Sequence, residues 1–377
     1  MPVHLSADQL ARDLARRDLT DPAAGPHALQ SLVRIAAGAL TGRWGNVARL
    51  CPGPRIVPIE DNYDNLRFTA GAASRDARYT RYVDDTRMLR SHSSAMVPPA
   101  LRALAADPVD DVLLVCPGIV YRRDTIDRLH TGTPHQLDLW RISRRPLGNE
   151  DMHDMTSTLL EALVPGMPSR TEPRVHPYTV DGRQVDVRAG DDWVEVWECG
   201  RAHPDVLARA GLRGWHGLAL GMGLDRILML RKGIDDIRLL RSADPRVASQ
   251  MLDLDRYRPV SSMPAVVRDL SVAVDRDDDV EDLGDRVRDA LGTEADAVEE
   301  VEVLSETAYA RLPPAAVARM GMSRRHKNVL VRVVIRPTDR TLSGAEANVL
   351  RDRIYGALHR GSRPEWSEPR QVSRRPR

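Results

Sequence analysis

G-L-A-L-G-M-G-L-D-R-I-L-M-L-R-K-G, residues 217–233, joins a glycine-rich run to a helical pattern within 17 residues. Three glycines in seven residues let a ligand or another backbone approach closely. Apolar residues recur at helical spacing from Leu224, and Gly233 ends the pattern, so we predict a strand that turns into a helix. Arg226 would lie in the first helical turn, where free backbone N–H groups favour an anion. A phosphate site and simple close packing both fit this pattern.

The composition is that of a globular protein with room for two domains. The 377 residues are 42% hydrophobic and 29% charged, with a formal net charge of +1. The longest apolar run, around Val112–Cys116, is too short to span a bilayer, and the first twenty residues lack the apolar segment of a signal peptide. Three widely spaced cysteines suit a reducing compartment. We therefore expect a cytoplasmic protein that makes no membrane contact.

A second informative stretch covers residues 118–138. Strand patterns at Val109–Val115 and His135–Ile142 flank a polar loop, which predicts an antiparallel hairpin with a charged connection. Arg122, at the end of the first strand, and Gln136, near the start of the second, would face the same cavity. Arginine can grip a phosphate or a carboxylate through two parallel hydrogen bonds. A solvated hairpin loop with surface ion pairs explains this stretch equally well.

Residues 83–97 place an imidazole and two hydroxyls, those of His92, Ser93 and Ser94, after a strand-like stretch. Such groups can hydrogen-bond a polar ligand. Ser94 is also a good N-cap for a helix at Val97–Leu104. From this segment alone, the N-cap is the favoured interpretation.

Four segments, in this order along the chain, resemble phenylalanyl-tRNA synthetase, a class II aminoacyl-tRNA synthetase. D-D-T-R-M-L-R-S-H-S-S (84–94) is similar to the segment before the family's amino-acid pocket. V-Y-R-R-D-T-I-D-x-x-H followed by H-Q (120–136) resembles motif 2 of its catalytic chain. W-V-E-V-W-E-C-G-R-A-H-P (193–204) resembles the strand before motif 3, and residues 217–238 resemble motif 3 itself.

The resemblance implies ATP-dependent activation of an amino acid and its transfer to tRNA, with ATP and Mg²⁺ as cofactors. Arg122 would hold the α-phosphate and the substrate carboxylate, and Arg226 would hold the γ-phosphate. Glu195 would bind Mg²⁺. The other ATP-binding residues implied are Asp124, His130, Pro134, Gly221 and Gly223. The amino-acid-binding residues implied are His92, Ser94, Gln136, Asp138, His176, Tyr178, Glu198 and Ala219.

Several positions around the amino-acid pocket depart from the family. The family commonly stacks adenine on a phenylalanine where this chain has Pro134, and it has a glycine where this chain has Glu198. Its F-P-F, whose rings hold the phenylalanine substrate, is His176-Pro177-Tyr178 here, and its F-A-F-G is Leu218-Ala219-Leu220-Gly221. A site with buried hydrogen-bonding groups penalises a substrate that cannot use them. The amino acid is therefore larger or more polar than phenylalanine, or these residues have drifted while phenylalanine is retained.

Two other functions compete with a phenylalanine–tRNA ligase-like enzyme. One is a paralogue that activates a more polar amino acid for a biosynthetic, non-translational acceptor. The other is a catalytically silent tRNA-binding paralogue, against which the retained motif residues count. A zinc site built from Cys199, His203, His130 and His135 matches no standard ligand spacing, and we do not expect one.

The region after Arg238 has the pattern of a second domain. Alternating strands are predicted at Arg268–Asp275, Val298–Leu304 and Val329–Ile335. Helices are predicted after the first and the last of them, and Ser343–Glu346 forms a capping box for the second helix. The order β-α-β-β-α predicts a ferredoxin-like split βαβ fold, although a closing strand after Gly361 is barely marked. The details resemble the ferredoxin-fold anticodon-binding domain of the same synthetases.

The predicted architecture is α+β, with a class II synthetase antiparallel-sheet catalytic domain and a ferredoxin-like C-terminal domain. We expect an N-terminal helical segment (1–60), the catalytic domain (61–241), a linker (242–259), the anticodon-binding-like domain (260–366) and a basic tail (367–377). A basic cluster in the C-terminal domain fits phosphate contacts to tRNA, although a solvated charge run explains it too. Its members are Arg319, Arg324, Arg325 and Lys327. The chain is expected to be a monomer or a homodimer.

Overall fold

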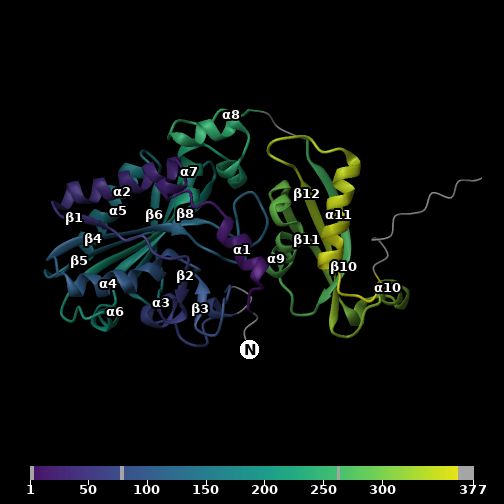
Figure 1. Cartoon of the computed structure of the whole chain (residues 1–377), viewed down its shortest axis with the longest axis horizontal. Coiled ribbons are helices and arrows are strands. Elements are labelled where there is room, and N and C mark those ends of the chain that lie inside the picture. Colours follow the sequence, from purple (N-terminus) through teal and green to yellow (C-terminus); the bar gives the residue numbers. More distant parts are fainter. Residues whose placement is uncertain (1–3, 77–79, 261–263, 364–377) are drawn as a thin grey trace, which may run out of the picture. The chain divides into compact units, whose positions relative to one another are not determined.

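The computed structural model describes residues 4–76, 80–260 and 264–363, which fall into two compact units (Figure 1). Unit 1 takes its described residues from 1–122, 133–241 and 245–258. Unit 2 takes its described residues from 123–132, 242–244 and 259–377. The predicted basic tail, 367–377, lies outside the described residues. The motif 2 loop, residues 123–132, therefore groups with the C-terminal part of the chain.

Unit 1 is built on a seven-stranded sheet with the order β1-β4-β5-β9-β8-β7-β6. Only the β1–β4 pair is parallel among these strands. The strands are β1 (Val47–Leu50), β4 (Asp111–Ile119), β5 (His135–Ser143), β6 (Ser169–Pro173), β7 (Thr179–Ala189), β8 (Asp192–Ala202) and β9 (His216–Gly223). A large antiparallel sheet was expected. The N-terminal segment also contributes β1 to it, because Val47 pairs with Val112 at the sheet edge.

Helices lie on both faces of this sheet (Figure 1). On one face, α4 (Val97–Ala106) and α6 (Pro204–Arg209) share an apolar cluster with Trp140 of β5 and Cys116 of β4. On the other, α2 (Ala28–Trp44) packs against α5 (Asn149–Leu163). The remaining elements of unit 1 are α1 (Ala7–Ala15), the pair β2 (Ile56–Pro58) and β3 (Arg87–Leu89), α3 (Ile59–Asn62), α7 (Leu224–Lys232) and α8 (Pro245–Ala248).

The stretch at 217–233 folds as its pattern predicts. β9 ends at Gly223, and α7 starts with the next residue. Gly233 ends the helix in the left-handed conformation, φ 68°, which glycine adopts without a steric penalty. The three glycines earlier in this stretch, Gly217, Gly221 and Gly223, serve different needs. A Cβ at Gly217 would lie 2.9 Å from the Cβ of Ala202, so this glycine permits close packing of strands.

The region predicted as a linker, 242–259, contains α8 and a 3₁₀ turn at Ser249–Leu252. Its Pro245–Arg258 part belongs to unit 1. Lys232 at the end of α7 is 1% exposed at its side chain and donates to the carbonyls of Asp253 and Asp255 and to the Asp253 carboxylate. A buried ammonium needs such partners, so this segment is held to unit 1 by a charged group rather than left loose.

Unit 2 contains a three-stranded antiparallel sheet with the order β10-β12-β11. Its elements are β10 (Val266–Asp275), α9 (Val280–Leu291), β11 (Val298–Ala308), α10 (Pro314–Met320), β12 (His326–Ile335) and α11 (Gly344–Leu358). Alternate residues of β12, from Val329 to Ile335, are fully buried, so one face of the sheet carries the core. The predicted capping box at the start of α11 is confirmed, since Ser343 and Glu346 bond each other's backbone N–H.

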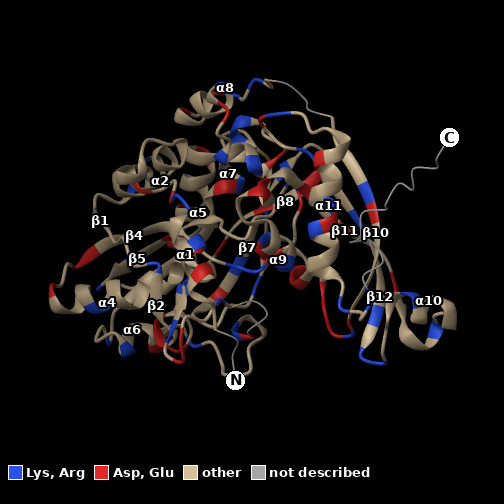
Figure 2. Cartoon of the chain, turned by 45° about the vertical axis from the view of Figure 1, so that its right-hand side comes forward, with Lys and Arg blue, Asp and Glu red and all other residues tan. Residues whose placement is uncertain are grey.

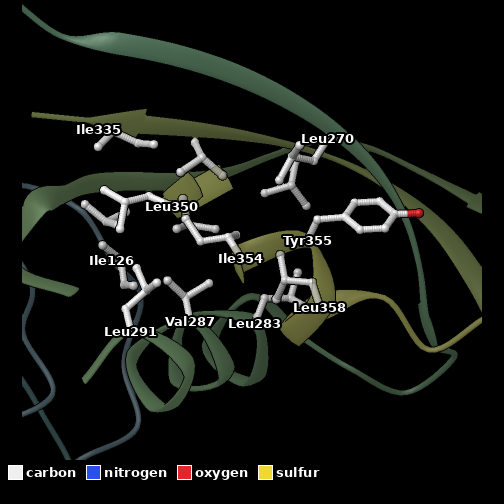
Figure 3. Packing of buried hydrophobic residues seen from close by; sticks show 14 of the residues in the cluster. Ile126, Leu270, Leu283, Val287, Leu291, Ile335, Leu350, Ile354, Tyr355 and Leu358 are labelled. Atoms are coloured by element: carbon white, nitrogen blue, oxygen red, sulfur yellow. The ribbon is translucent and has the colours of Figure 1, made fainter. Parts of the chain in front are cut away.

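Side chains from α9 and α11 fill the space over this sheet (Figure 3). Leu283, Val287 and Leu291 come from α9, and Ile354 and Leu358 come from α11. The described strands have the order and antiparallel pairing of the first three strands of a ferredoxin-like split βαβ. The fourth strand of that fold would follow Gly361. The ferredoxin-like fold remains a proposal, because most of that stretch, 364–377, lies outside the described residues.

Candidate active site

Residues of four neighbouring strands lie side by side on one face of the large sheet. Cys116 of β4 pairs in register with Asp138 of β5, Asp138 pairs with Gly221 of β9, and Gly221 pairs with Glu198 of β8. Residues directly opposite one another project to the same face. A Cβ added at Gly221 would have the Asp138 carboxylate as its nearest neighbour, at 3.6 Å. The half-buried glycine therefore puts no side chain between Asp138 and Glu198.

Asp138 is the buried polar centre of this face. Its carboxylate accepts hydrogen bonds from the hydroxyls of Ser93 (2.5 Å) and Ser94 (3.1 Å) and from the indole N–H of Trp140 (3.0 Å). Burial raises the pKa of Asp138, although these donors oppose the shift. Ser94 was favoured as a helix cap from its segment alone, and that interpretation is wrong. Helix α4 has Met96 as its N-cap without a side-chain bond, because the Ser94 hydroxyl is used by Asp138.

Arg122 and Gln136 meet the segment that carries His92. The Nε of Arg122 donates to the carbonyl of Ser91 at 2.8 Å, and the Ser93 N–H donates to the Gln136 side chain at 3.1 Å. Burial, followed by the charge of Arg122, lowers the pKa of His92 to about 3. Three of the segments singled out in the sequence are thus brought together around Asp138. These residues give the site a neutral imidazole, a guanidinium and an amide.

The Arg226 side chain lies beside Glu195. Arg226 is the third residue of α7, and its guanidinium donates to the carbonyl of Glu195 at 3.5 Å. Burial and the neighbouring Glu198 carboxylate raise the pKa of Glu195, while Arg226 opposes the shift. A half-buried carboxylate beside an arginine at a helix N-terminus has the charges needed for a triphosphate with a hard cation. Gly223, the N-cap of α7, keeps the approach to these N–H groups free of a side chain.

An aromatic stack carries the side chains that depart from the family. The ring of Tyr178 stacks on His176, with 5.8 Å between centroids, and on Trp140, at 6.0 Å. Glu198 accepts a hydrogen bond from Arg174 Nε at 3.0 Å, and its other oxygen lies 2.8 Å from His176 Nε2. Burial alone would raise the pKa of Glu198, but His176 and then Arg174 bring it below its usual value. Ala219 is buried in the cluster that contains Trp140.

Asp124 and His130 lie on the loop that belongs to unit 2. Ile126 of this loop is part of the unit 2 core, and its carbonyl accepts from the Val301 N–H at 2.8 Å. The Asp124 carboxylate accepts from the Thr125 N–H, and the His130 ring pairs with Asp127 at 2.8 Å. The structure thus does not place these two residues relative to Arg122 and Arg226. Pro134 is in unit 1, and its carbonyl accepts from the Val120 N–H.

The buried pair His135 and Asp225 was not predicted as part of the site. The Nε2 of His135 accepts from the Leu19 N–H, so Nδ1 carries the proton and donates to Asp225 at 3.0 Å. Asp225 also accepts from the His135 backbone N–H. The pair joins the start of β5 to the start of α7, and so holds Gln136 and Arg226 on fixed elements. The sequence signal for this pair was Asp225, an acidic residue at the second position of the predicted helix that follows Gly223.

The predicted tRNA-binding residues lie in unit 2 (Figure 2). Lys327 of β12 pairs with Glu306 of β11 at 2.9 Å, and Arg325 donates to the ring of His326. Arg319 and Arg324 are exposed. Close to this cluster is a surface groove of about 530 Å³, whose lining includes Tyr309, Met322 and Arg363. The cluster is a mixed charged surface rather than a purely basic one.

Comparison with known proteins agrees with this geometry. Residues 49–251 match the family model of the tRNA synthetases class II core domain (F). The chain is 33% identical to the phenylalanine–tRNA ligase alpha subunit of Prochlorococcus marinus over 65% of this chain and 72% of the relative. The family is thereby shown. The chain belongs to the phenylalanyl-tRNA synthetase family.

Other relatives differ in how much of each chain is aligned. The alpha subunit of Leptospira biflexa is 32% identical over 52% of this chain and 61% of its own length. A probable mitochondrial phenylalanine–tRNA ligase of Drosophila melanogaster is 26% identical over 80% of this chain and 75% of that protein. A pyrrolysyl-tRNA synthetase structure from Desulfitobacterium hafniense is similar over 62% of this chain, with 22% identity and a TM-score of 0.46, too low to bear on function.

Family membership identifies the chain as an aminoacyl-tRNA synthetase-type ligase with a class II core. It favours a phenylalanine–tRNA ligase-like function over the two competing functions. Within the described residues, no helix has the length and apolar character needed to cross a membrane. No cluster of three or more metal-binding side chains occurs in the same part of the chain.

Proposed function

We propose that unit 1 joins an aromatic amino acid to AMP, with release of pyrophosphate, and that the chain then transfers the aminoacyl group to tRNA. The observation that supports this best is the continuous polar face that runs from Arg122 and Asp138 past Gly221 to Glu195 and Arg226. It offers a cation and a buried carboxylate for the amino acid, and a second cation for phosphates. The name of the relatives supports phenylalanine as the reference substrate.

The residues present suit a reaction without a covalent enzyme intermediate. An oxygen of the amino acid's carboxylate attacks the α-phosphorus of ATP, the bond to the pyrophosphate oxygen breaks, and the electron pair leaves with pyrophosphate. Positioning and charge neutralisation supply most of the acceleration in such chemistry. Arg122 would hold the attacking carboxylate and the α-phosphate, and Arg226 the γ-phosphate. Asp138, Gln136 and His92 would hold the amino group.

Glu195 is the residue proposed to bind Mg²⁺. Mg²⁺ is commonly held by one or two carboxylates together with substrate phosphates, so a cluster of protein ligands is not required. Burial raises the pKa of Glu195, and a cation would relieve the cost of its charge. The ion would neutralise phosphate charge as it develops on the leaving group. The residues present therefore fit ATP with Mg²⁺.

Unit 2 is proposed to bind tRNA through Arg319, Arg324, Arg325 and Lys327. Family membership and the exposure of Arg319, Arg324 and Arg325 support the assignment. Removing one phosphate contact weakens binding and reduces its dependence on salt by about one counterion. We also propose a cytoplasmic location and a monomer or homodimer. Cell fractionation decides between the cytoplasm and an organelle, and light scattering on the purified chain measures the subunit number.

Amino-acid-dependent exchange between ATP and pyrophosphate tests the adenylation step directly. Arg226→Ala should lower the exchange rate about 100- to 1,000-fold, because a charge aimed at the transition state is lost. Arg213→Ala, an exposed arginine outside the site, is the matched control and should leave the rate unchanged. A wild-type rate in the Arg226 variant would refute its assignment. The absence of exchange with any amino acid would refute adenylation itself.

A further inference from the structure

Gly221 is half-buried and has a carboxylate on each side, so the absence of a side chain leaves an opening at this position. Asp138 and Glu198 are the residues paired with Gly221 on its two neighbouring strands, so both project to the face from which Gly221 projects nothing. The Asp138 side has its hydrogen bonds supplied by Ser93, Ser94 and Trp140. The Glu198 side chain is 26% exposed, so it borders the opening rather than the core. The two sides of the opening are therefore chemically different.

The rings beside this opening are already in contact with one another. His176 and Tyr178 are stacked at 27° with 5.8 Å between centroids, within the ordinary range for two rings in contact. A substrate ring that lies beside this pair would meet polar groups. The Tyr178 phenol lies close enough to Ser94, Asp138 and Glu198 for all three to influence its ionisation.

Glu198 retains capacity to accept another hydrogen bond. An ionised carboxylate offers about four acceptor positions. Glu198 accepts one hydrogen bond from Arg174 and has His176 Nε2 within 2.8 Å of its second oxygen. His176 and Arg174 fix the carboxylate in place and keep it ionised. A fixed anion at the border of an aromatic site favours a ligand that brings a donor and disfavours a purely apolar one.

We propose that Glu198, held by Arg174 and lying beside His176, is a specificity-determining residue that selects aromatic amino acids whose ring carries a hydrogen-bond donor, such as a phenol hydroxyl or an aromatic amine. The inference rests on the proposed function and refines it. It concerns only the ring that the site admits, and the adenylation reaction and the tRNA acceptor are unchanged. The competing explanation is that Glu198 serves only to pair with Arg174 and His176.

The test is the ratio of kcat/KM in ATP–pyrophosphate exchange for each ring-substituted amino acid relative to phenylalanine. The substituted substrates are para-hydroxy-, meta-hydroxy- and para-amino-phenylalanine. A ratio measured on one preparation does not depend on the fraction of protein that is folded. The wild-type ratio should be about 10 to 100 for the best substituted substrate, the range expected for a hydrogen bond to a charged group. Glu198→Gly should bring that ratio to about 1, and Glu198→Gln should lie between.

Glu172→Gln is the control variant. Glu172 is an exposed glutamate of β6 that also pairs with an arginine, Arg170, at 3.4 Å. The kcat/KM ratio of the Glu172→Gln variant should equal the wild-type ratio. If the wild-type protein uses phenylalanine at least as well as every substituted substrate, the inference is overturned and the proposed function stands. If the preference exists but survives Glu198→Gly, the assignment to Glu198 is overturned. If no amino acid supports exchange, the proposed function fails and the inference fails with it.

Discussion

The two units differ in the make-up of their main cores. Unit 1 buries charged groups in the middle of its fold, among them Arg90, Asp138, Asp225 and Lys232, each at 3% exposure or less. The main core of unit 2 consists of apolar residues and one tyrosine, Tyr355. Charged residues of its strands β10 and β12, such as Asp269 and Arg332, lie outside that core (Figure 2). Both units are built on antiparallel strands, so the difference reflects use rather than architecture.

The difference shows which unit holds buried charged groups near a candidate binding site. A buried charge costs free energy unless it is paired and hydrogen-bonded, and the charges of unit 1 meet that condition. Arg90, for example, donates to the carbonyls of Ile119 and Gly53 and faces Asp18. A Cβ at Gly118 would lie 2.1 Å from the Arg90 guanidinium, so the backbone leaves room for this cation. In unit 1, these buried and paired charges fix polar groups near the candidate site. The main core of unit 2 is instead stabilised by apolar packing.

Removing one member of a buried polar pair in unit 1 should have the largest effect on stability. Asp225→Ala leaves His135 and its backbone N–H without their acceptor, and it should lower the free energy of unfolding by about 3–5 kcal/mol. Chemical denaturation of the full chain measures the change, and hydrogen exchange assigns it to unit 1. Asp192→Ala, an exposed aspartate of β8, is the control and should change stability by less than about 0.5 kcal/mol. A loss below about 1 kcal/mol would contradict the pairing.

Creating a cavity in unit 2 should cost slightly less and should stay within that unit. Ile354→Ala removes a fully buried side chain from α11 and should cost about 2–5 kcal/mol. Hydrogen exchange should speed up in β10, β12 and α9 but not in the sheet of unit 1. Val349→Ala, on the same helix but 59% exposed, is the matched control. Equal effects of the two variants would show that the apolar core is not what stabilises unit 2.

Acidification should weaken unit 1 through His27, the N-cap of α2. Its Nδ1 accepts from the Leu29 N–H, and Nε2 donates to the Leu240 carbonyl. Burial lowers the pKa of His27 to about 4, against an ordinary value of 6.5. The unfolded chain therefore binds the extra proton first. The resulting stability is present above pH 6.5 and is lost as the pH falls towards 4.

Because of His27, the free energy of unfolding should fall by roughly 1.4 kcal/mol for each pH unit between pH 6.5 and about 4. Denaturation of the wild-type chain and of His27→Asn, which keeps a capping acceptor, measures the difference in slope. The variant should show a flatter dependence over this range. Identical slopes in the two proteins would show that His27 is not responsible.

The smallest effect is expected from an exposed ion pair on the outer face of the unit 2 sheet. Arg332 and Asp269 pair across β12 and β10 at 2.9 Å, and both are well exposed. Solvent and salt screen such a pair, so Arg332→Ala should change the melting temperature less than any variant above. The difference from wild type should vanish in 1 M salt. A shift that matched that of Ile354→Ala would overturn the contrast drawn between the core and the outer face.

Local features of the fold were predictable because they depend on a few adjacent residues. The turn from β9 into α7, the stop at Gly233 and the capping box at Ser343 follow from glycine conformations and helical spacing. The strands at His135–Ser143 and His326–Ile335 follow from alternation of apolar residues. The resemblance then indicated which of these elements carry the candidate site.

The partners of the polar side chains were less predictable. Ser94 has the sequence position of a helix cap, yet its hydroxyl is bound by Asp138, 44 residues away. Residues 123–132 have the pattern of a simple hairpin loop, yet Ile126 is buried in the core of unit 2. For Ser94 the long-range partner is favoured because the Asp138 carboxylate is buried and needs a donor. For Ile126 the core is favoured because it removes apolar surface from water.

The amino-acid sequence alone determined the turn from β9 into α7, the order of β10, α9, β11, β12 and α11, the positions of Arg122 and Arg226, and the family to which they point. Those properties depend on short-range periodicity and on residue type. Strand register brings Asp138, Gly221 and Glu198 into one row and His176 against Glu198. These contacts join residues tens of positions apart, and a shift of one residue in pairing would turn the side chains to the opposite face. The chemistry of the pocket is therefore a property of the folded sheet.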